Sequence, residues 1–373
     1  MLKVGVIGCG KMADNHFYQI KKIPTCRLAG VCDSERLMAR QAAVRAGIDA
    51  YYDDVDIFLD AVRPDVVHIT TPPQSHYELA MKCISRGIHL YVEKPFAIDF
   101  RVTDEILRAA SLKGLKVTVG HNAQFSPAMN HMRKKVAGGF LGGKPIHMES
   151  YYCYNIENKR YAQSLLGDNN HWVRRLPGTL VQNTISHGIA KIAEFLDTED
   201  PDVKVLSYVS PTLKSIGENK IVDELRVMIH DRVNMSAFLT FSTQIRPAAL
   251  HQFRIYGPHN GIFVDHNTQT VQEIDNESYK SYLNYLVPQL KTARQYLSIA
   301  IRNLNALLAR RLRNDFGMHY LVRQFYASII DGSEPPISYR QIRLTYLIMD
   351  RIIEEMADDQ SAGNVPESLQ ATG

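Results

Sequence analysis

The chain has 373 residues, of which 45% are hydrophobic and 22% charged, a composition typical of a globular protein with room for about two domains. Its 43 basic and 39 acidic residues nearly balance, no apolar run is long enough for a membrane-spanning helix, and we expect no signal peptide at MLKVGVIGCG. Five cysteines without CxxC spacing or a nearby histidine cluster argue against a zinc site or a disulfide framework, and favour a reducing cytoplasm.

Short β-branched runs alternate with helical patterns over the first third of the chain. The runs typical of strands lie at residues 3–8, 28–33, 66–70, 88–93 and 116–120. Proline-free stretches with helical spacing lie between them, at 35–46, 75–86 and 101–113. Because strands and helices alternate, and the strands are nearly continuous apolar runs, we expect an α/β domain with a doubly wound parallel sheet covered on both faces.

A glycine-rich turn follows the first strand directly, at residues 8–13. In such a G-x-G-x-x-A turn the glycines allow a tight turn and the close approach of a pyrophosphate to the backbone. Asp33 ends the second strand about 20 residues later, where a carboxylate binds ribose hydroxyls and repels a 2′-phosphate. The pattern therefore predicts NAD, with NADP less favoured, and the alternative is a glycine turn without a ligand. The turn residues expected to bind are Gly8, Gly10, Lys11, Met12 and Ala13.

After about residue 122 the pattern changes to strands with few helices between them. The runs typical of strands lie at 147–152, 203–209, 223–230, 234–242, 251–257 and 261–265. We therefore expect an α+β domain with a large, mostly antiparallel open sheet. The predicted division is a cofactor domain over 1–122, a substrate and oligomerisation domain over 123–360, and a flexible polar tail over 361–373.

The strand HLYV at 89–92 ends in Glu93, Lys94 and Pro95, at the edge where parallel sheets bind ligands. This VEKP motif, the turn GVIGCGKMA and VHITTPPQSH (67–76) together resemble the Gfo/Idh/MocA oxidoreductases, which include glucose–fructose oxidoreductase and inositol dehydrogenase. The resemblance covers nearly the whole chain and implies a Rossmann domain followed by a domain with an open sheet. It also implies that the cofactor is lined by Thr71, Pro72, His76, Glu93, Lys94 and Asn122.

The resemblance implies that Lys94 lies between nicotinamide and substrate. A lysine there stabilises the alkoxide that develops on an oxidised hydroxyl, and burial lowers its pKa so that it can also move the proton. Without the motif, Lys94 would be a solvated residue at a strand end.

Residues 177–195 resemble the family segment G-G-x-x-x-D-x-G-x-H-x-x-D. His187 matches the histidine, whereas Asn183 and Ala190 replace the two aspartates. Asn183 and His187 are four residues apart and share a helix face. We expect His187 to act as general acid–base, since imidazole titrates near neutrality, and Asn183 to bind a substrate hydroxyl. The alternative for His187 is a helix histidine that satisfies a backbone group.

The loop before this helix holds the single tryptophan, Trp172, together with Arg174. An aromatic ring beside a guanidinium suits a sugar face with an anionic substituent, although a packed aromatic in a surface loop has the same sequence. We therefore predict an NAD-dependent oxidoreductase acting on a sugar, cyclitol or sugar nucleotide, as a homo-oligomer (dimer or tetramer) without nucleic acid. The alternatives are an enzyme that keeps NAD for a reaction without net redox change, and a weakly catalytic cofactor-binding scaffold.

About residues 278–318 look inserted before a closing helical pattern at 320–356. No acidic residue occurs from Ser278 to Asn314, although this stretch holds seven basic residues. The apolar residues of its helical stripe are Leu297, Ile301, Leu304, Leu308 and Leu312, and Arg302, Arg310, Arg311 and Arg313 lie off the stripe. Three interpretations remain open: a core or oligomer-interface helix, a lid over a sugar diphosphate, and a helix on the inner face of an anionic membrane.

Overall fold

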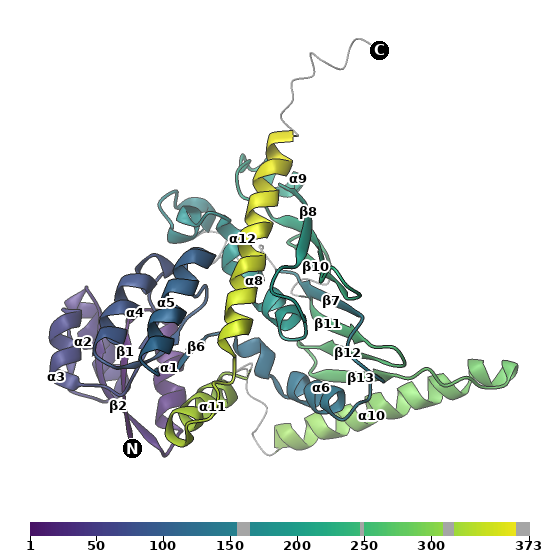
Figure 1. The fold of residues 1–373 in the computed structure, drawn as a ribbon, viewed down its shortest axis with the longest axis horizontal. Helices are drawn as coiled ribbons and strands as arrows, with labels where there is room; N and C mark the ends of the chain where they lie inside the picture. Colours follow the sequence, from purple (N-terminus) through teal and green to yellow (C-terminus); the bar gives the residue numbers. More distant parts are fainter. Residues whose placement is uncertain (155–164, 247–249, 309–316, 363–373) are drawn as a thin grey trace, which may run out of the picture. The chain divides into compact units, whose positions relative to one another are not determined.

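The computed structural model describes residues 1–154, 165–246, 250–308 and 317–362 (Figure 1). The chain forms two compact units, Met1–Asn122 with Met318–Leu347, and Ala123–Gly317 with Ile348–Gly373. The predicted second domain ran without interruption over 123–360, whereas Met318–Leu347 groups with the first unit. The predicted tail lies almost wholly outside the described residues.

The first unit is built on a six-stranded parallel sheet with the order β3-β2-β1-β4-β5-β6. Its strands are β1 (Leu2–Ile7), β2 (Cys26–Cys32), β3 (Tyr51–Tyr52), β4 (Val66–Ile69), β5 (His89–Val92) and β6 (Val117–Val119). The five predicted strands and the doubly wound class are confirmed, and the two-residue β3 was missed. The strand order reverses between β1 and β4, which is where open sheets of this class bind ligands.

Helices cover both faces of this sheet, as the buried strands require (Figure 1). They are α1 (Lys11–Lys21), α2 (Arg36–Ala46), α3 (Val55–Val62), α4 (His76–Ser85), α5 (Phe100–Leu112) and α11 (Met318–Asp331), with a short 3-10 turn η1 (Pro73–Ser75). Asp54 caps α3 by accepting from Ile57 N, and Asp99 caps α5 by accepting from Val102 N. Such caps satisfy N–H groups that the helix leaves unpaired at its start.

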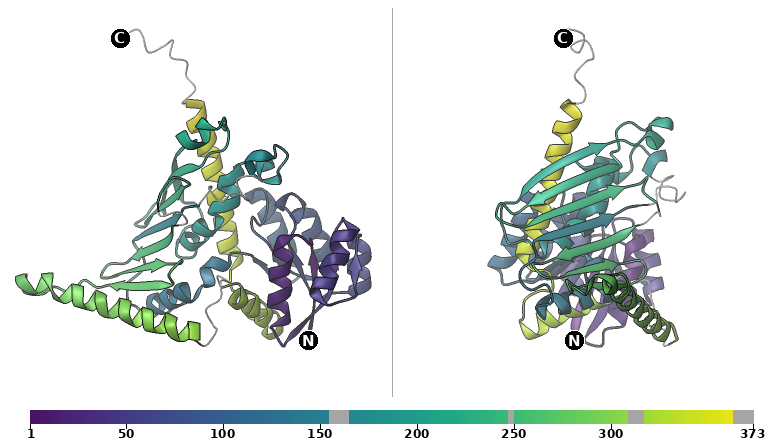
Figure 2. Two further views of the ribbon diagram at one scale, coloured as in Figure 1. Left: turned by 180° about the vertical axis from the view of Figure 1, so that it is seen from behind. Right: turned by 90° about the vertical axis from the view of Figure 1, so that its right-hand side faces the viewer.

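The second unit contains a seven-stranded sheet with the order β13-β12-β11-β7-β10-β9-β8 (Figure 2). Its strands are β7 (His147–Tyr152), β8 (Asp202–Tyr208), β9 (Glu224–His230), β10 (Ser236–Ser242), β11 (His251–Tyr256), β12 (Gly261–Asp265) and β13 (Thr270–Ile274). The central pair β7–β10 is parallel and the other pairs are antiparallel. The predicted mostly antiparallel sheet is confirmed, and β13 was missed.

The helices of the second unit are gathered mainly on one face of its sheet. They are α6 (Pro127–Ala137), α8 (Thr179–Ala193), α9 (Pro211–Ser215) and α10 (Val287–Leu308), with the 3-10 turns η2 (Asn122–Phe125), η3 (Trp172–Arg175) and η4 (Ser281–Tyr285). The long α12 (Tyr339–Ala362) belongs to the first unit up to Leu347 and to the second beyond it. Helix α8 packs against β7 and β10 and is almost wholly buried. The opposite face of the sheet is open in the right-hand view of Figure 2.

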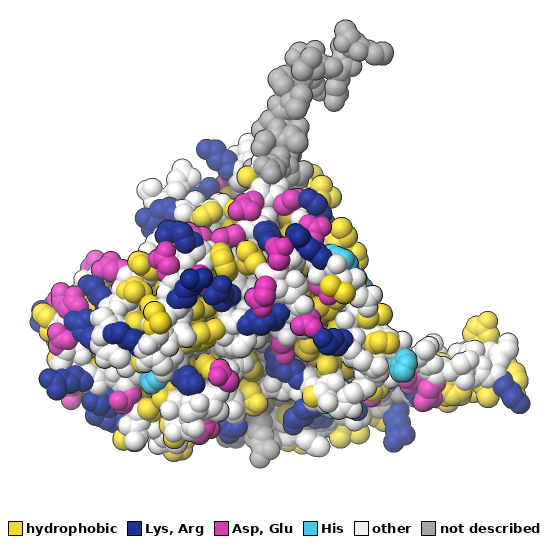
Figure 3. All heavy atoms as spheres, in the orientation of Figure 1, with side chains coloured by type: hydrophobic (Ala, Val, Ile, Leu, Met, Phe, Trp, Pro, Cys, Tyr) yellow, Lys and Arg dark blue, Asp and Glu magenta, His cyan; other side chains and the backbone are white. Residues whose placement is uncertain are grey.

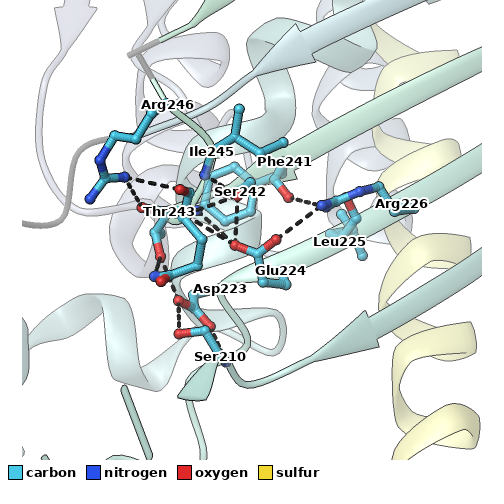
Figure 4. Close-up of polar contacts among 11 residues, drawn as sticks. Ser210, Asp223, Glu224, Leu225, Arg226, Phe241, Ser242, Thr243, Ile245 and Arg246 are labelled. Atoms are coloured by element: carbon cyan, nitrogen blue, oxygen red, sulfur yellow. Dashed lines mark hydrogen bonds and ion pairs between the residues drawn. The ribbon is translucent and has the colours of Figure 1, made fainter. Parts of the chain in front are cut away.

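A buried pair of carboxylates holds one end of this sheet together (Figure 4). Asp223 accepts hydrogen bonds from the backbone N–H of Ser210 at 2.6 Å and its hydroxyl at 2.7 Å, and from the Thr243 hydroxyl. Glu224 Oε1 accepts from the Ser242 hydroxyl at 2.6 Å and from Thr243 N at 3.1 Å. Because buried carboxylates are costly unless they are hydrogen-bonded, these contacts fix the segments that follow β8 and β10 to the start of β9.

No helix in the described part of the chain is both long and apolar enough to cross a membrane.

Candidate functional site

A cavity of about 390 Å³ opens at the carboxyl ends of β1, β2 and β4. Five residues predicted from the sequence line it: Gly8, Gly10, Asp33, Thr71 and Pro72. The other turn residues begin α1, where Ala13 is buried against the sheet and Lys11 and Met12 are exposed. The cavity therefore lies at the point where the strand order reverses, as expected for a ligand site of this fold.

The glycine turn has the backbone that an anion site needs. Gly8 has a φ of +94°, and a Cβ there would lie 2.7 Å from the Thr71 Cγ2 atom. A Cβ on Gly10 would meet no atom within 4 Å, so its backbone faces open space. Gly10 also caps α1 without a side-chain hydrogen bond. The first N–H groups of α1 are thus directed at a space that suits a phosphate, where the helix dipole favours negative charge.

Asp33 is fixed inside this cavity by the backbone. Its Oδ2 atom accepts from Cys9 N at 2.7 Å, and its Oδ1 atom accepts from Glu35 N at 3.0 Å. An ionised carboxylate has about four acceptor positions, so two remain for ribose hydroxyls. The open Gly10, the start of α1 and Asp33 together fit a dinucleotide.

Glu93 is buried at the carboxyl end of β5 and is held from two sides. Its Oε1 atom accepts from His16 Nε2 at 3.0 Å, and its Oε2 atom accepts from Lys94 N at 3.2 Å. A Cβ on Gly120 would lie 2.9 Å from this carboxylate, so only glycine leaves room for it. Burial raises the pKa of Glu93, but the hydrogen bond and the charge of His16, together with Lys94, outweigh burial and leave the pKa below its usual value.

A buried chain of polar groups continues from Glu93 through the first unit. His16 Nδ1 lies 2.7 Å from His68 Nδ1, and His68 Nε2 lies 2.8 Å from the Tyr326 hydroxyl. Burial lowers the pKa of His68 well below 6.5, with a further contribution from His16. The sequence analysis missed these three residues, and the available signal was a histidine inside the apolar strand VVHI. This series of buried polar contacts links the motif after β5 to helix α11, which is remote in sequence.

Lys94 is half-buried and its ammonium is destabilised. Desolvation lowers its pKa from the usual 10.5, against the opposing charge of Glu93. Beside it, burial and the Lys94 charge lower the pKa of His121 to about 3, so this imidazole stays neutral. Asn122 follows at the start of η2 and is half-buried. A lysine in such a setting can hold or release a proton closer to neutrality than an exposed one.

His76 is held between two loops of the first unit, and its contact with the cofactor stays a prediction. It is fully buried, and its two ring nitrogens lie 2.8 Å from the Thr71 carbonyl oxygen and 3.0 Å from that of Phe96. The ring thus bridges the loop after β4 and the loop after β5. This geometry supports a positioning role for His76 behind the cavity wall formed by Thr71 and Pro72.

In the second unit, Asn183 and His187 lie one turn apart on α8, and both are buried. The Tyr152 ring stacks on His187 with 5.7 Å between ring centroids. One turn further, Lys191 is completely buried, and its Nζ atom lies 5.8 Å from the centroid of the Tyr152 ring. The predicted pair of residues is therefore extended by a lysine on the same helix face.

Lys191 is the centre of a cluster that the sequence analysis missed. Its Nζ atom lies 3.2 Å from His266 Nε2, and the Tyr152 ring stacks on His251 with 4.3 Å between centroids. Desolvation lowers the pKa of Lys191 to about 7. Burial lowers the pKa of His251 to about 4 and that of His266 well below 6.5, and the charge of Lys191 is the second cause of both shifts. All three groups are thus driven toward their neutral forms.

Trp172 and Arg174 lie on η3 in the same unit. Trp172 is half-buried and stacks on His171 with 5.8 Å between centroids. The Arg174 guanidinium donates to Glu218 Oε2 at 2.8 Å and to the Leu165 carbonyl oxygen at 2.9 Å. These contacts support a structural role for Arg174, and its substrate contact stays a prediction.

All five cysteines are buried free thiols. Burial raises the pKa of Cys9 and Cys32 to about 12, and the negative charge of Asp33 is the second cause. Among the described residues, no three His, Cys, Asp or Glu side chains are grouped to hold a metal ion.

Comparison with known proteins identifies the first part of the chain. The model of an oxidoreductase family with an NAD-binding Rossmann fold, GFO_IDH_MocA, matches residues 2–121. D-glucoside 3-dehydrogenase from Escherichia coli is 31% identical over 142 residues, which cover 38% of this chain and 40% of the relative. UDP-N-acetylglucosamine 3-dehydrogenase from Acidithiobacillus ferrooxidans is 31% identical over 149 residues, which cover 40% of this chain and 44% of the relative. The chain thus matches less than half the length of each of these relatives.

The likeness in structure extends over nearly the whole chain. An NAD-binding oxidoreductase from Klebsiella pneumoniae superimposes with a TM-score of 0.77 at 18% identity, covering 95% of this chain and 96% of the other. At this identity the likeness shows the fold of both units and nothing finer. The sequence of residues 2–121 is thus similar to the NAD-binding Gfo/Idh/MocA oxidoreductases, and this part of the chain contains Gly8, Gly10 and Asp33, which line the cavity.

Proposed function

We propose that the protein is an NAD-dependent oxidoreductase that exchanges hydride at a hydroxyl-bearing ring carbon of a sugar, cyclitol or sugar nucleotide. The observation that carries the proposal is the Glu93–Lys94 pair at the carboxyl end of β5, next to β4, whose following loop lines the dinucleotide cavity. Two of the relatives that match the chain are named as dehydrogenases of a glucoside and of a sugar nucleotide, which supports this substrate class.

NAD, when bound, supplies the group that accepts or donates hydride. The chain supplies position and proton transfer. Glu93, held by His16, suits the ribose next to the nicotinamide. Lys94, whose pKa lies below 10.5, can take the proton of the substrate hydroxyl in its neutral form and stabilise the developing alkoxide in its charged form. From the second unit we assign proton transfer to His187 and hydroxyl binding to Asn183, as the resemblance implies.

Because Asn183 and Ala190 replace two carboxylates of the family pattern, the proton route does not include an acid at these positions. Lys94 and His187 are then the titratable groups on which turnover depends. This departure from the family pattern leaves two alternative functions to be tested: a reaction without net redox change, and a weakly catalytic scaffold. The names of the relatives favour net oxidation.

Absorbance at 340 nm during a screen of sugars, cyclitols and sugar nucleotides separates these functions. Net accumulation of NADH supports the proposal. Product formation without NADH would replace it by the reaction that retains NAD, and tight NAD binding without any turnover would replace it by the scaffold.

A lysine variant tests the central assignment. Lys94→Ala should abolish hydride transfer while NAD still binds, because the cavity formed by Gly8, Gly10 and Asp33 does not include Lys94. Turnover should be measured beside the NAD dissociation constant, with Lys113→Ala as an exposed control. A Lys94→Ala enzyme that keeps more than a small fraction of turnover would contradict the proposal.

We further propose that the chain forms a homo-oligomer through the open sheet face and acts in the cytoplasm on a small molecule, without nucleic acid. Phe238 on β10 pairs with Met228 on β9, and both side chains are nearly half exposed. Leu206 on the neighbouring β8 is exposed as well. Apolar residues gathered on an open face favour association of subunits.

A further inference from the structure

Helix α10 presents an apolar face to solvent along its whole length. The exposed apolar residues on this face are Leu290, Tyr296, Leu297, Ile301, Leu304, Leu307 and Leu308, each between 47% and 74% exposed. In the described helix only Ile299 is buried, so α10 is not part of the core. Figure 3 shows hydrophobic side chains along the lower side of this helix, at the right of the view. Soluble proteins rarely expose so continuous an apolar surface without a binding role.

The opposite face of α10 is attached to the second unit by polar contacts. Gln295 accepts from Glu273 N at 2.8 Å and donates to the Glu273 carbonyl oxygen at 3.0 Å. Further along, Arg302 donates to the Gln269 carbonyl oxygen at 2.9 Å, and Asn303 donates to that of Thr268 at 3.0 Å. These contacts fix the rotation of the helix about its axis, and they thereby hold the apolar face directed away from β13.

The width of this face limits what can cover it. With about 100° between consecutive residues of an α-helix, the side chains from Tyr296 round to Ile301 span an arc of roughly 140°. A coiled-coil seam is narrower, because it uses two positions in seven. Tyr282 and Tyr285, on the adjoining η4, are strongly exposed and extend the apolar surface with aromatic rings. A wide apolar arc that ends in aromatics suits the interface of a lipid bilayer.

The charges around the arc favour an anionic lipid surface over a second copy of the chain. Helix α10 contains no acidic residue, and the exposed Arg294 borders the arc. Lys291 is the one basic residue of the described helix with acidic partners, at Asp275 and Glu277. Two copies packed through this face would bring Arg294 against a helix that offers no carboxylate. Anionic lipid headgroups would supply the missing countercharge.

We propose that α10 and η4 form a surface that binds the protein to an anionic bilayer, with the helix lying in the plane of the interface. The core, lid and oligomer interpretations of the 278–318 segment are then replaced by this one. Arg310, Arg311 and Arg313, which the sequence analysis assigned to the same basic stretch, lie outside the described residues and carry no part of the argument.

The test is co-sedimentation of the full-length protein with phosphatidylcholine vesicles, with and without phosphatidylglycerol. Binding is expected with the anionic vesicles, and it should weaken as salt is added. The apolar variant should lose about a hundredfold in affinity, because it removes three aliphatic side chains from the lipid and the partial burial of each favours binding by about fivefold. It carries Leu297→Gln, Ile301→Gln and Leu304→Gln.

A matched control removes as much exposed apolar surface elsewhere on the protein. It carries Leu112→Gln, Ile216→Gln and Val233→Gln, three residues between 63% and 89% exposed. This control should bind vesicles like the wild type. Arg294→Gln should lose about fivefold on anionic vesicles and nothing on neutral ones, since each basic residue near an anionic bilayer contributes about that factor.

Several outcomes would overturn the proposal. They are a wild type that does not sediment with anionic vesicles, a control variant that loses as much binding as the apolar variant, and equal binding to neutral and anionic vesicles. A fall in oligomer mass by light scattering for the apolar variant, without vesicle binding by the wild type, would assign the face to a second copy instead. These results are independent of NADH formation, so they separate this proposal from the proposed activity.

Discussion

Replacing Lys191 by methionine should stabilise the second unit at neutral pH. Lys191 is completely buried on α8 without an acidic partner among the described residues, and desolvation lowers its pKa from 10.5 to about 7. At 1.36 kcal/mol for each factor of ten in proton affinity, this burial costs the folded state roughly 5 kcal/mol at pH 7. Methionine has a similar length and no charge, so the variant avoids this cost.

The variant also loses a hydrogen bond. Lys191 Nζ lies 3.2 Å from His266 Nε2, and a buried ring nitrogen left without a partner costs about 1–3 kcal/mol. The expected net gain at pH 7 is therefore about 2–4 kcal/mol. The neighbouring Tyr152 and His251 rings are retained, and both face the same side chain in the variant.

The pH dependence gives the sharper test. The pKa of Lys191 is lower in the folded state than in the unfolded state, so between pH 7 and about 10.5 the unfolded state binds the additional proton. Wild-type stability from this group accordingly rises with pH in that window. The advantage of Lys191→Met should shrink by about 3 kcal/mol between pH 7 and pH 9.5. Buried cysteines titrate in the same range, but they are common to both proteins and cancel in the difference.

Urea unfolding followed by tryptophan fluorescence measures the difference in the free energy of unfolding. The signal reports on the second unit, because the single tryptophan, Trp172, lies on η3, which packs against α8. Lys214→Met, on the surface of α9, is the matched control and should change stability by less than about 0.5 kcal/mol at both pH values. The reasoning fails if Lys191→Met destabilises the unit by a similar amount at both pH values, since Lys191 would then be a well-compensated cation.

Gly8→Ala should lower stability by about 1–3 kcal/mol and weaken NAD binding, because its φ of +94° and the Thr71 methyl at 2.7 Å leave no room for a Cβ; unchanged thermal unfolding and NAD affinity would contradict this. Asp33→Ala should narrow the preference for NAD over NADP, measured as the ratio of their dissociation constants, and tighter NADP binding by the wild type would refute the assignment. Met228→Lys with Phe238→Lys should lower the oligomer mass in light scattering without loss of fold, and an unchanged mass would place the interface elsewhere.

The sequence by itself determined the class of both units. Alternating apolar strands and helical stretches can bury their surfaces only as a parallel sheet covered on two faces, and the strands after residue 122 pair mainly with their neighbours in the chain. The positions of the glycine turn and of Asp33 were also predictable, since they depend on local backbone conformation and on the end of one strand. Short strands such as Tyr51–Tyr52 were not, because two residues give no periodicity.

The tertiary structure alone decided which residues far apart in the chain form networks. His16, His68 and Tyr326 come from α1, β4 and α11, and no local pattern joins a histidine to a tyrosine more than 250 residues away. Lys191 looked like one more polar residue on a helix, and only the sheet packed against α8 makes it a buried amine. Hydrogen bonding and desolvation depend on which side chains are brought together when the chain packs. The spacing of residues along the sequence does not specify this.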